Sequence, residues 1–220
     1  MSVFAILPVK GLAAAKQRLA HELGPGHRQA LVEAMLCDVL VALRRSQAID
    51  HVLVLSGDRT AQQIAASYGM EVVDEEDRGH NAAARQGIEH ALAAGATRVL
   101  LVPGDCPLLD AAELDALVKW PAGARSALVV PDRHGTGTNA LLLTPPDALE
   151  PAFGPGSCER HTAAAAAQEA EVKVMTVPTL ALDIDTPEDI TALEQEFATR
   201  HGGAARTRGA LGQLRRSLGG

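Results

Sequence analysis

Short apolar runs alternate with amphipathic stretches along most of the 220-residue chain. The apolar runs are rich in Val, Leu and Ile and are too short for helices of normal length, which indicates buried strands. This alternation is typical of βαβ units and predicts a single α/β domain, with a mixed, mostly parallel sheet flanked by helices. The expected strands are Val3–Val9, His51–Ser56, Glu71–Val73, Arg98–Val102, Ser126–Pro131, Ala140–Leu143, Val172–Val177 and Ala181–Ile184. The expected helices are His27–Arg44, Thr60–Tyr68, Asn81–Ala94, Asp110–Val118, Cys158–Gln168 and Pro187–Thr199.

The alternating pattern stops at Arg200. The segment that follows is rich in glycine and arginine and contains no acidic residue. Such a composition buries little apolar surface, so it predicts a flexible basic tail over residues 200–220, after a folded domain over residues 1–199. A tail that contacts a nucleotide or a partner chain is the alternative interpretation.

Acidic residues stand at the ends of two apolar runs. In VLLVPGDCPLLD a Pro-Gly pair breaks the run and leaves Asp105 at the carboxyl end of a strand. In ALDIDTPEDI, Asp183 and Asp185 are two residues apart, so in extended chain they point to the same side. Carboxylates gathered at strand ends bind hard divalent cations such as Mg²⁺, which are usually shared with phosphates. The pattern therefore predicts a metal site that handles a phosphate ester.

Each of these carboxylates also has a structural alternative. Asp105 could form a turn or cap the next helix, although Asp110 is better placed for that cap. Asp183 and Asp185 could cap the last expected helix, but Thr186 followed by proline already makes a good helix start. Metal binding is therefore the favoured interpretation.

Basic residues follow the first expected strand. Lys10, Lys16 and Arg18 lie in the loop at its carboxyl end, where open α/β sheets bind ligands. Three cations could neutralise a triphosphate while N–H groups of the small residues between them contact its oxygens. The spacing is not that of a P-loop. The alternative is an ordinary solvated basic loop.

Two further segments combine glycines with hydroxyl groups. PDRHGTGTNA leads through Thr138 into an apolar run, and FGPGS places Gly154 and Ser157 before an expected helix. Glycine lets the backbone approach an anion closely, and hydroxyl and helix N-terminal N–H groups donate hydrogen bonds to it. Both segments are therefore candidate phosphate or carboxylate sites. A hairpin turn and a helix N-cap at Ser157 are the alternatives.

Asn81 begins another expected helix, in the stretch GHNAAARQG. It could simply cap this helix. The functional alternative is that Asn81, or the helix N-terminus, contacts the base or ribose of a nucleotide.

Composition excludes several classes of protein. A net charge of −7 and an aromatic content of only 2% argue against a nucleic-acid partner. The three cysteines lack CxxC spacing, which argues against disulfides and a zinc site. Because no run is long enough to span a membrane and the first residues do not form a signal peptide, we expect a cytoplasmic protein without a membrane partner.

The motifs taken together resemble one family, the guanylyltransferases of deazaflavin coenzyme F-420 biosynthesis. The resemblance runs from about Val3 to about Phe197, and its most specific parts are GTGTNAL and LDIDTPED. The other segments that carry it are PVK(x)5AKxRL, GxNxA, PGDCPLL and FGPGSxxxH. Members of this family join GTP to a small phosphorylated three-carbon acid. Their fold is similar to that of nucleotide-diphospho-sugar transferases.

The resemblance implies roles for the candidate residues. The acid would be bound by Thr138, Gly154 and Ser157. One departure is His80, where an apolar residue is expected. The remaining implied roles are Mg²⁺ ligation by Asp105, Asp183 and Asp185 and binding of the GTP phosphates by Lys10 and Lys16. In the reaction, we expect Lys10, Lys16 and Arg18 to stabilise the leaving pyrophosphate. Asn81 stays a candidate for contact with the nucleotide.

The implied reaction is transfer of GMP from GTP to phosphoenolpyruvate, in which enolpyruvyl-diphospho-5′-guanosine and pyrophosphate form. Acceptance of 2-phospho-L-lactate or 3-phosphoglycerate instead is open, because these acids share the phosphate and the carboxylate. Molybdopterin guanylyl transfer would require a different glycine-rich loop after the first strand. A catalytically silent nucleotide-binding scaffold is the alternative of another class. The downstream transferase that consumes the product is a possible partner.

Overall fold

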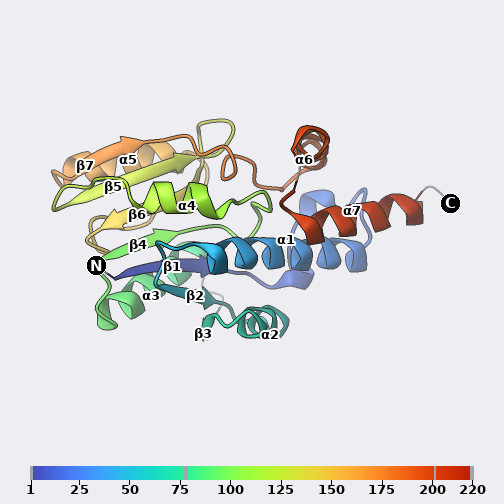
Figure 1. Cartoon of the computed structure of the whole chain (residues 1–220), viewed down its shortest axis with the longest axis horizontal. Coiled ribbons are helices and arrows are strands. Elements are labelled where there is room, and N and C mark those ends of the chain that lie inside the picture. The colour runs from blue at the N-terminus through green and yellow to red at the C-terminus, as the bar shows by residue number, and fades with distance from the viewer. Residues whose placement is uncertain (1, 77–78, 201, 219–220) are drawn as a thin grey trace.

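The computed structural model describes residues 2–76, 79–200 and 202–218. Within these residues, one seven-stranded sheet has the order β3-β2-β1-β4-β6-β5-β7 and carries helices on both faces (Figure 1). Only β6 runs antiparallel to its neighbours, so the predicted mixed, mostly parallel sheet is confirmed. The strands are β1 (Val3–Pro8), β2 (His51–Leu55), β3 (Glu71–Val73), β4 (Arg98–Leu101), β5 (Ser126–Pro131), β6 (Thr138–Thr144) and β7 (Glu171–Val174). The helices are α1 (Pro25–Arg45), α2 (Arg59–Ser67), α3 (His80–Ala93), α4 (Ala111–Val118), α5 (Ser157–Ala167), α6 (Pro187–Thr199) and α7 (Ala205–Leu218), with 3₁₀ turns η1 (Leu12–Ala14) and η2 (Gln17–Leu19).

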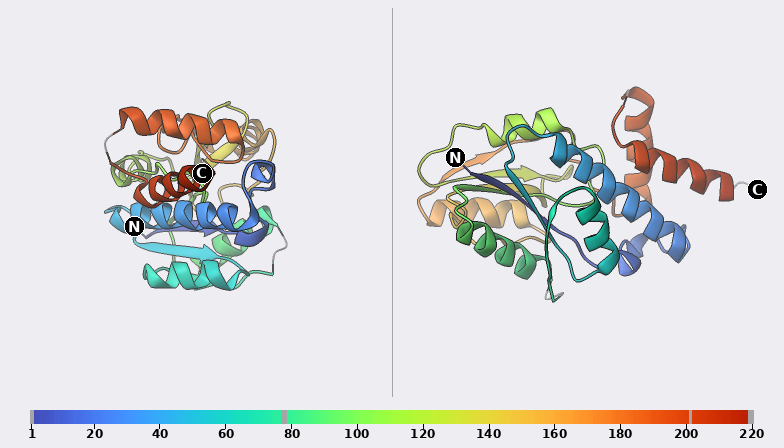
Figure 2. Two further views of the ribbon diagram at one scale, coloured as in Figure 1. Left: turned by 90° about the vertical axis from the view of Figure 1, so that its right-hand side faces the viewer. Right: turned by 60° about the horizontal axis from the view of Figure 1, so that its bottom comes forward.

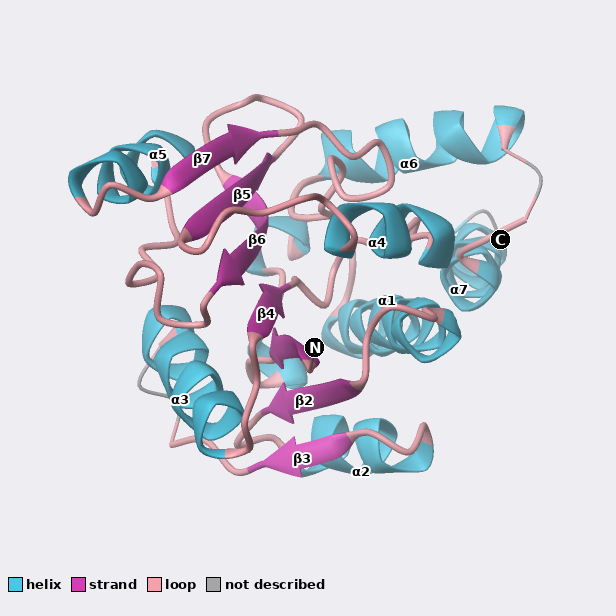
Figure 3. Cartoon of the chain, turned by 60° about the vertical axis from the view of Figure 1, so that its left-hand side comes forward, coloured by secondary structure: helices cyan, strands magenta, loops and turns pink. Residues whose placement is uncertain are grey.

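Different helices cover the two faces of the sheet. Helices α3 and α5 pack on one face, and α1, α2 and α4 pack on the other (Figure 3). In β1, Ala5 and Leu7 belong to the core under α1, whereas Phe4 and Ile6 belong to the core under α3. A central strand buried on both faces is apolar at successive positions, which is why this segment shows no alternation. None of the described helices is both long and apolar enough to cross a membrane.

One expected strand is absent, and two others differ from their expected limits by two residues or more at one end. Residues Ala181–Ile184 form a loop rather than a strand. The apolar side chains of Leu182 and Ile184 are buried in the core on the α1 side, which explains the strand-like pattern. Their segment has no strand beside it: the N–H of Ile184 donates instead to the carbonyl of Asp105, at 3.1 Å. Strand β6 begins two residues earlier than expected, and β7 ends at Val174 rather than Val177.

The expectation of a flexible tail is wrong for residues 205–218, which form helix α7 beside α1 (Figure 2). Leu211 and Leu214 on α7 are buried in the core that α1 also lines. The carboxylate of Asp38 on α1 accepts from the N–H groups of Arg206 and Thr207, at 3.2 and 2.8 Å, and from the Thr207 hydroxyl at 2.7 Å. Asp38 therefore caps the start of α7 from another helix, because the first N–H groups of a helix have no acceptor within the helix itself. Residues 201, 219 and 220 lie outside the described residues.

Loss of this cap should detach α7. We expect Asp38→Ala to lower the free energy of unfolding by about 2 kcal/mol, because two N–H groups and a buried hydroxyl lose their acceptor. Urea unfolding measures this loss, and hydrogen exchange should show faster exchange confined mainly to α7. Glu194→Ala is the matched control, because it removes only the partly exposed ion pair with Arg215 and should cost less than about 1 kcal/mol. Equal stability of the two variants would contradict the capping role.

Candidate active site

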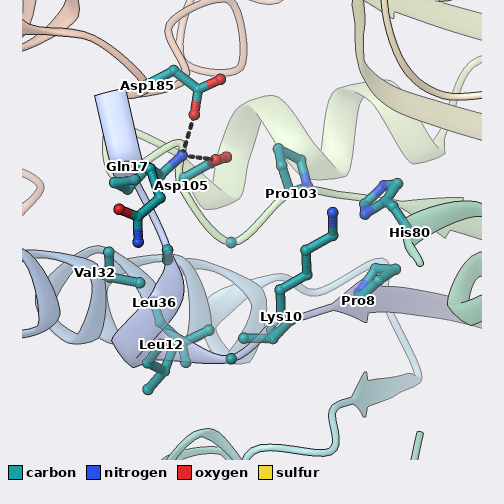
Figure 4. Close-up of a pocket in the computed structure, with 15 residues that line it drawn as sticks. Pro8, Lys10, Leu12, Gln17, Val32, Leu36, His80, Pro103, Asp105 and Asp185 are labelled. Atoms are coloured by element: carbon teal, nitrogen blue, oxygen red, sulfur yellow. Dashed lines mark hydrogen bonds and ion pairs between the residues drawn. The ribbon is translucent and has the colours of Figure 1, made fainter. Parts of the chain in front are cut away.

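A cavity of about 510 Å³ opens at the carboxyl ends of β1 and β4 (Figure 4). These strands are neighbours, but the chain leaves β1 through α1 on one face and enters β4 from α3 on the other. Open α/β sheets bind ligands at such a switch point. The walls come from the β1–α1 loop, α1, the start of α3, the turn after β4 and the loop before α6. A second cavity of about 390 Å³ shares Val9, Lys10 and Gly11 with the first, so the two lie next to each other.

Lys16 lies at the centre of the polar wall. Its ammonium pairs with Asp105 Oδ2 and, at 2.6 Å, with Asp185 Oδ1; dashed lines in Figure 4 mark both ion pairs. The Lys16 side chain is only 9% exposed. Burial lowers its pKa, but the two carboxylates more than offset burial and raise the pKa above the usual value. Lys16 also has a left-handed backbone, with φ of 56°, which is costly for a residue with a Cβ. Lys16 therefore contributes a positive charge to the cavity wall at neutral pH.

The three predicted metal carboxylates come from two loops beside this lysine. Asp105 follows β4, and its Oδ1 is buried without a hydrogen-bond partner. Asp183 Oδ1 accepts from the Asn139 side-chain amide at 3.1 Å. Burial raises the pKa of Asp183, the charge of Asp105 raises it further, and the Asn139 hydrogen bond lowers it only in part. The site therefore concentrates negative charge that favours a cation.

The carboxylates do not form a ready metal site. Among the described residues, no three carboxylate, imidazole or thiol groups converge as metal ligands do. Two of the predicted ligands, Asp105 and Asp185, are instead held by the ammonium of Lys16. Metal ligation by these residues stays a prediction.

The other predicted cations lie nearer to solvent. Lys10 lines both cavities, and Figure 4 shows its side chain extending into the first on the side of Pro103 and His80. Arg18 is 74% exposed, with Nη1 3.9 Å from Asp185 Oδ2. Lys10 is therefore available to an anion that enters the cavity, and Arg18 is an exposed cation beside Asp185 at its edge, whereas Lys16 is fixed in the wall.

Asp189 and Arg133 support Asp185, although neither was predicted as a site residue. Asp189 Oδ2 accepts from the N–H groups of Asp185 and Thr186, at 2.9 and 2.7 Å, and its Oδ1 pairs with Arg133 Nη2 at 2.6 Å. The contact ties the β5–β6 loop to the start of α6. The capping box of Thr186 and Asp189 confirms that the helix start leaves Asp183 and Asp185 free of capping.

The residues predicted to bind the acid gather where the β5–β6 loop meets α5. The N–H of Cys158 donates to the carbonyl of Thr136 at 3.1 Å, and this bond joins the two segments. Ser157 is the first residue of α5, and its N–H donates to the carbonyl of Gly154 at 3.0 Å. Gly154 has φ of 119°, a conformation that favours glycine. Thr138, Gly154 and Ser157 thus come from two adjacent segments, but none of them lines either of the two cavities. Binding of the acid by these residues stays a prediction.

Asn81 holds this loop rather than pointing at the cavity. Its Oδ1 accepts from the N–H of Phe153 at 2.7 Å, and its Nδ2 donates to the carbonyl of Phe153 at 3.2 Å. Both polar atoms of the side chain are therefore engaged next to Gly154. The structure favours a supporting role for Asn81 over the predicted contact with a nucleotide.

His161 is fully buried and was given no role from the sequence. Thr138 Oγ1 lies 3.0 Å from its Nδ1, and the N–H of Ala152 donates to its Nε2 at 2.8 Å. Burial, together with the charge of Arg160, lowers its pKa to about 4, so the ring is neutral at pH 7. The available signal was spacing, because His161 stands one helical turn after Ser157 in FGPGSxxxH.

The buried ring should make stability pH-dependent. The unfolded chain protonates His161 near pH 6.5 and the folded one only near pH 4, so its contribution is fully present above pH 6.5 and is lost as the pH falls to 4. The loss amounts to about 3 kcal/mol. Urea unfolding of the wild type and of His161→Asn between pH 4 and pH 7 should show a smaller decline in the variant. Parallel pH profiles would contradict a neutral buried imidazole.

Comparison with known proteins places these features in a family. The family model "Guanylyl transferase CofC like" matches residues 3–218. A Conexibacter woesei protein named phosphoenolpyruvate guanylyltransferase is 52% identical over 99% of this chain and 98% of its own. A Methanothermobacter thermautotrophicus protein named 2-phospho-L-lactate guanylyltransferase is 36% identical over 86% of this chain and 83% of its own.

Solved structures show the same fold at low sequence identity. A Desulfovibrio desulfuricans protein described as a nucleotide-diphospho-sugar transferase has a TM-score of 0.74 at 16% identity and 98% coverage of both chains. A Leptospira borgpetersenii cytidylyltransferase has a TM-score of 0.62 at 16% identity, covering 100% of this chain and 96% of its own. The fold predicted from the sequence is therefore confirmed. Since the family model covers nearly the whole chain, this protein belongs to the CofC-like guanylyl transferase family.

Proposed function

We propose that the protein transfers GMP from GTP to phosphoenolpyruvate, forming enolpyruvyl-diphospho-5′-guanosine and releasing pyrophosphate. One observation carries the proposal: a buried lysine and a group of carboxylates line a cavity at the switch point of a sheet, in a chain with a 52% identical relative named for this activity. A phosphate oxygen of the acid attacks the α-phosphorus of GTP, and the bond between the α-phosphorus and the bridging oxygen breaks.

The chain's task is to bring two anions together and cancel their repulsion. The attacking phosphate oxygen is already an anion at neutral pH, so no general base is needed. The Lys16 ammonium is fixed by Asp105 and Asp185 and supplies a preorganised positive charge in a largely buried place. Lys10 and Arg18 would bind the phosphates of GTP and stabilise the leaving pyrophosphate.

Two features support Mg²⁺ as the metal, although the carboxylates are not arranged as a ready site. Carboxylate oxygens are the ligands that this ion prefers, and Asp105 Oδ1 is buried without a partner. Asp105, Asp183 and Asp185 would hold it. When bound, the ion would neutralise charge shared by the two substrates. Asn139 would orient Asp183 through its side-chain amide.

The acid would bind at Thr138, Gly154 and Ser157, through the hydroxyl groups of Thr138 and Ser157 and the backbone of Gly154 just before α5. These donors suit a carboxylate or a phosphate, which only accept hydrogen bonds from them. Because 2-phospho-L-lactate carries the same two groups, it is the second candidate, and the 36% identical relative is named for it.

Pyrophosphate release tests the proposal. The protein is incubated with GTP and Mg²⁺ and with phosphoenolpyruvate, 2-phospho-L-lactate or 3-phosphoglycerate in turn, with ATP in place of GTP and with EDTA as controls. The downstream transferase is included in a parallel series to draw off the activated product. We expect release with phosphoenolpyruvate and GTP that EDTA abolishes. Release only with another acid would keep the reaction and change the acceptor, whereas silence with every acid in a folded, GTP-binding protein would favour a scaffold.

A further inference from the structure

We propose that His161 is a positioning residue that makes the Thr138 hydroxyl an obligate hydrogen-bond donor toward the acid substrate. The inference rests on the proposed function, since it concerns how that acid is bound.

The proton on His161 can be located from its two partners. The N–H of Ala152 can only donate, so Nε2, at 2.8 Å, must accept and carries no proton. The ring is fully buried and neutral at pH 7, so its one proton is on Nδ1. Nδ1 therefore donates to Thr138 Oγ1, 3.0 Å away. Because a backbone N–H fixes the tautomer, it does not depend on the substrate.

This tautomer determines whether the Thr138 hydroxyl donates or accepts a hydrogen bond at the acid site. A hydroxyl both donates and accepts, and here Oγ1 accepts from the ring, so its own proton must point away from the ring. Among the described residues, no acceptor within the protein is found for the hydroxyl proton of Thr138. That proton is therefore free for an anionic group of the acid. With the opposite tautomer, Thr138 would donate to the ring and turn a lone pair toward the anion, which would repel it.

Two conservative variants separate this role from simple support of the loop. In His161→Asn, Nδ2 can replace Nδ1 as the donor to Thr138, but the Ala152 N–H loses its acceptor. In His161→Gln, Oε1 can replace Nε2 as the acceptor from Ala152, but Thr138 loses its donor. Positioning of Thr138 predicts that Asn preserves the KM for the acid and Gln does not. If His161 only supported the loop, KM for the acid would rise equally in both variants, or more in His161→Asn than in His161→Gln.

The quantities measured are KM for phosphoenolpyruvate, KM for GTP and kcat. They are compared in the wild type, His161→Asn, His161→Gln, His161→Phe, Thr138→Val and the double variant that combines His161→Phe with Thr138→Val. We expect His161→Gln, His161→Phe and Thr138→Val each to raise KM for the acid about 10-fold or more, because a hydrogen bond to a charged group is weakened. KM for GTP should change less than about twofold. The double variant should be no worse than Thr138→Val alone, because both changes remove one interaction. Additive effects, or equal KM in the Asn and Gln variants, would overturn the proposal.

A second measurement does not depend on activity. ¹⁵N NMR of protein labelled at histidine should show His161 protonated at Nδ1 and unprotonated at Nε2 at pH 7, with Thr138→Val leaving Nε2 unchanged. A proton on Nε2 would refute the tautomer even in an active enzyme. The expected tautomer in a protein that transfers no GMP would leave the geometry intact and refute the proposed function instead.

Discussion

Replacing Lys16 with methionine is expected to lower kcat/KM for GMP transfer by about 10³-fold. Methionine keeps an unbranched apolar side chain in the cavity wall, so the main change is loss of the ammonium. Without it, Asp105 and Asp185 lose the ammonium that pairs with both of them, so the negative charge facing the substrate phosphates increases. The repulsion that the site must cancel then opposes formation of the transition state. Steady-state pyrophosphate release at saturating Mg²⁺ measures the loss.

Arg18→Met is the matched control for this experiment. It removes a positive charge near the same carboxylate, but Arg18 is largely exposed and 3.9 Å from Asp185. Solvent screens such a charge, so we expect a loss of about 10-fold or less. Rates should be compared at a temperature where circular dichroism shows both variants folded, since breaking the buried ion pair of Lys16 also destabilises the fold. Equal losses of kcat/KM in Lys16→Met and Arg18→Met would show that catalysis depends on the net charge near the cavity and not on the fixed position of the Lys16 ammonium.

The sheet could be predicted because its central strands are buried on both faces. Segments such as VFAILP and VLLV are apolar at successive positions and too short for helices of normal length, which favours buried strands. Ala181–Ile184 has the same apolar pattern but lacks a neighbouring strand. An apolar sequence pattern indicates that a segment is buried. A strand also requires a neighbouring strand whose backbone N–H and C=O groups are free to pair with it.

Helix α7 could not be predicted because its support comes from elsewhere in the chain. Its glycines and arginines indicate disorder, yet Asp38 caps its first turn from α1, and Leu211 and Leu214 complete the shared core. A contact across about 170 residues leaves no local signal. The same holds for Asn81, whose partners are backbone atoms 72 residues away.

Part of the candidate site follows from the sequence by a general rule. Lys16 and Asp105 come together because loops at the carboxyl ends of adjacent parallel strands share one edge of the sheet. The sequence does not show which of the side chains at that edge pair with one another. The ammonium of Lys16 pairs with two carboxylates that the pattern assigned to a metal. His161 was missed because a buried histidine shows its role only through its two partners.

Asp183→Asn is expected to lower kcat about 10²-fold or more without destabilising the metal-free protein. The amide keeps an oxygen that can accept from Asn139, so the loop should stay in place. Burial and the neighbouring Asp105 raise the pKa of Asp183, which means that its ionised form is held at a cost near neutral pH. Removing that charge should leave Tm in EDTA equal to or above that of the wild type. Activity falls because a carboxylate proposed to hold Mg²⁺ is gone.

The response of Tm to Mg²⁺ separates these effects without any assay of activity. An ion that binds only the folded protein raises Tm, so Mg²⁺ should stabilise the wild type and stabilise Asp183→Asn much less. Asp110→Asn is the control, because Asp110 caps α4 through the N–H of Ala112 at 2.9 Å and is given no role in metal binding. That variant should keep the full response to Mg²⁺. An Asp183→Asn protein with wild-type turnover and an unchanged Mg²⁺ response would remove Asp183 from the mechanism and leave the buried carboxylate without a function.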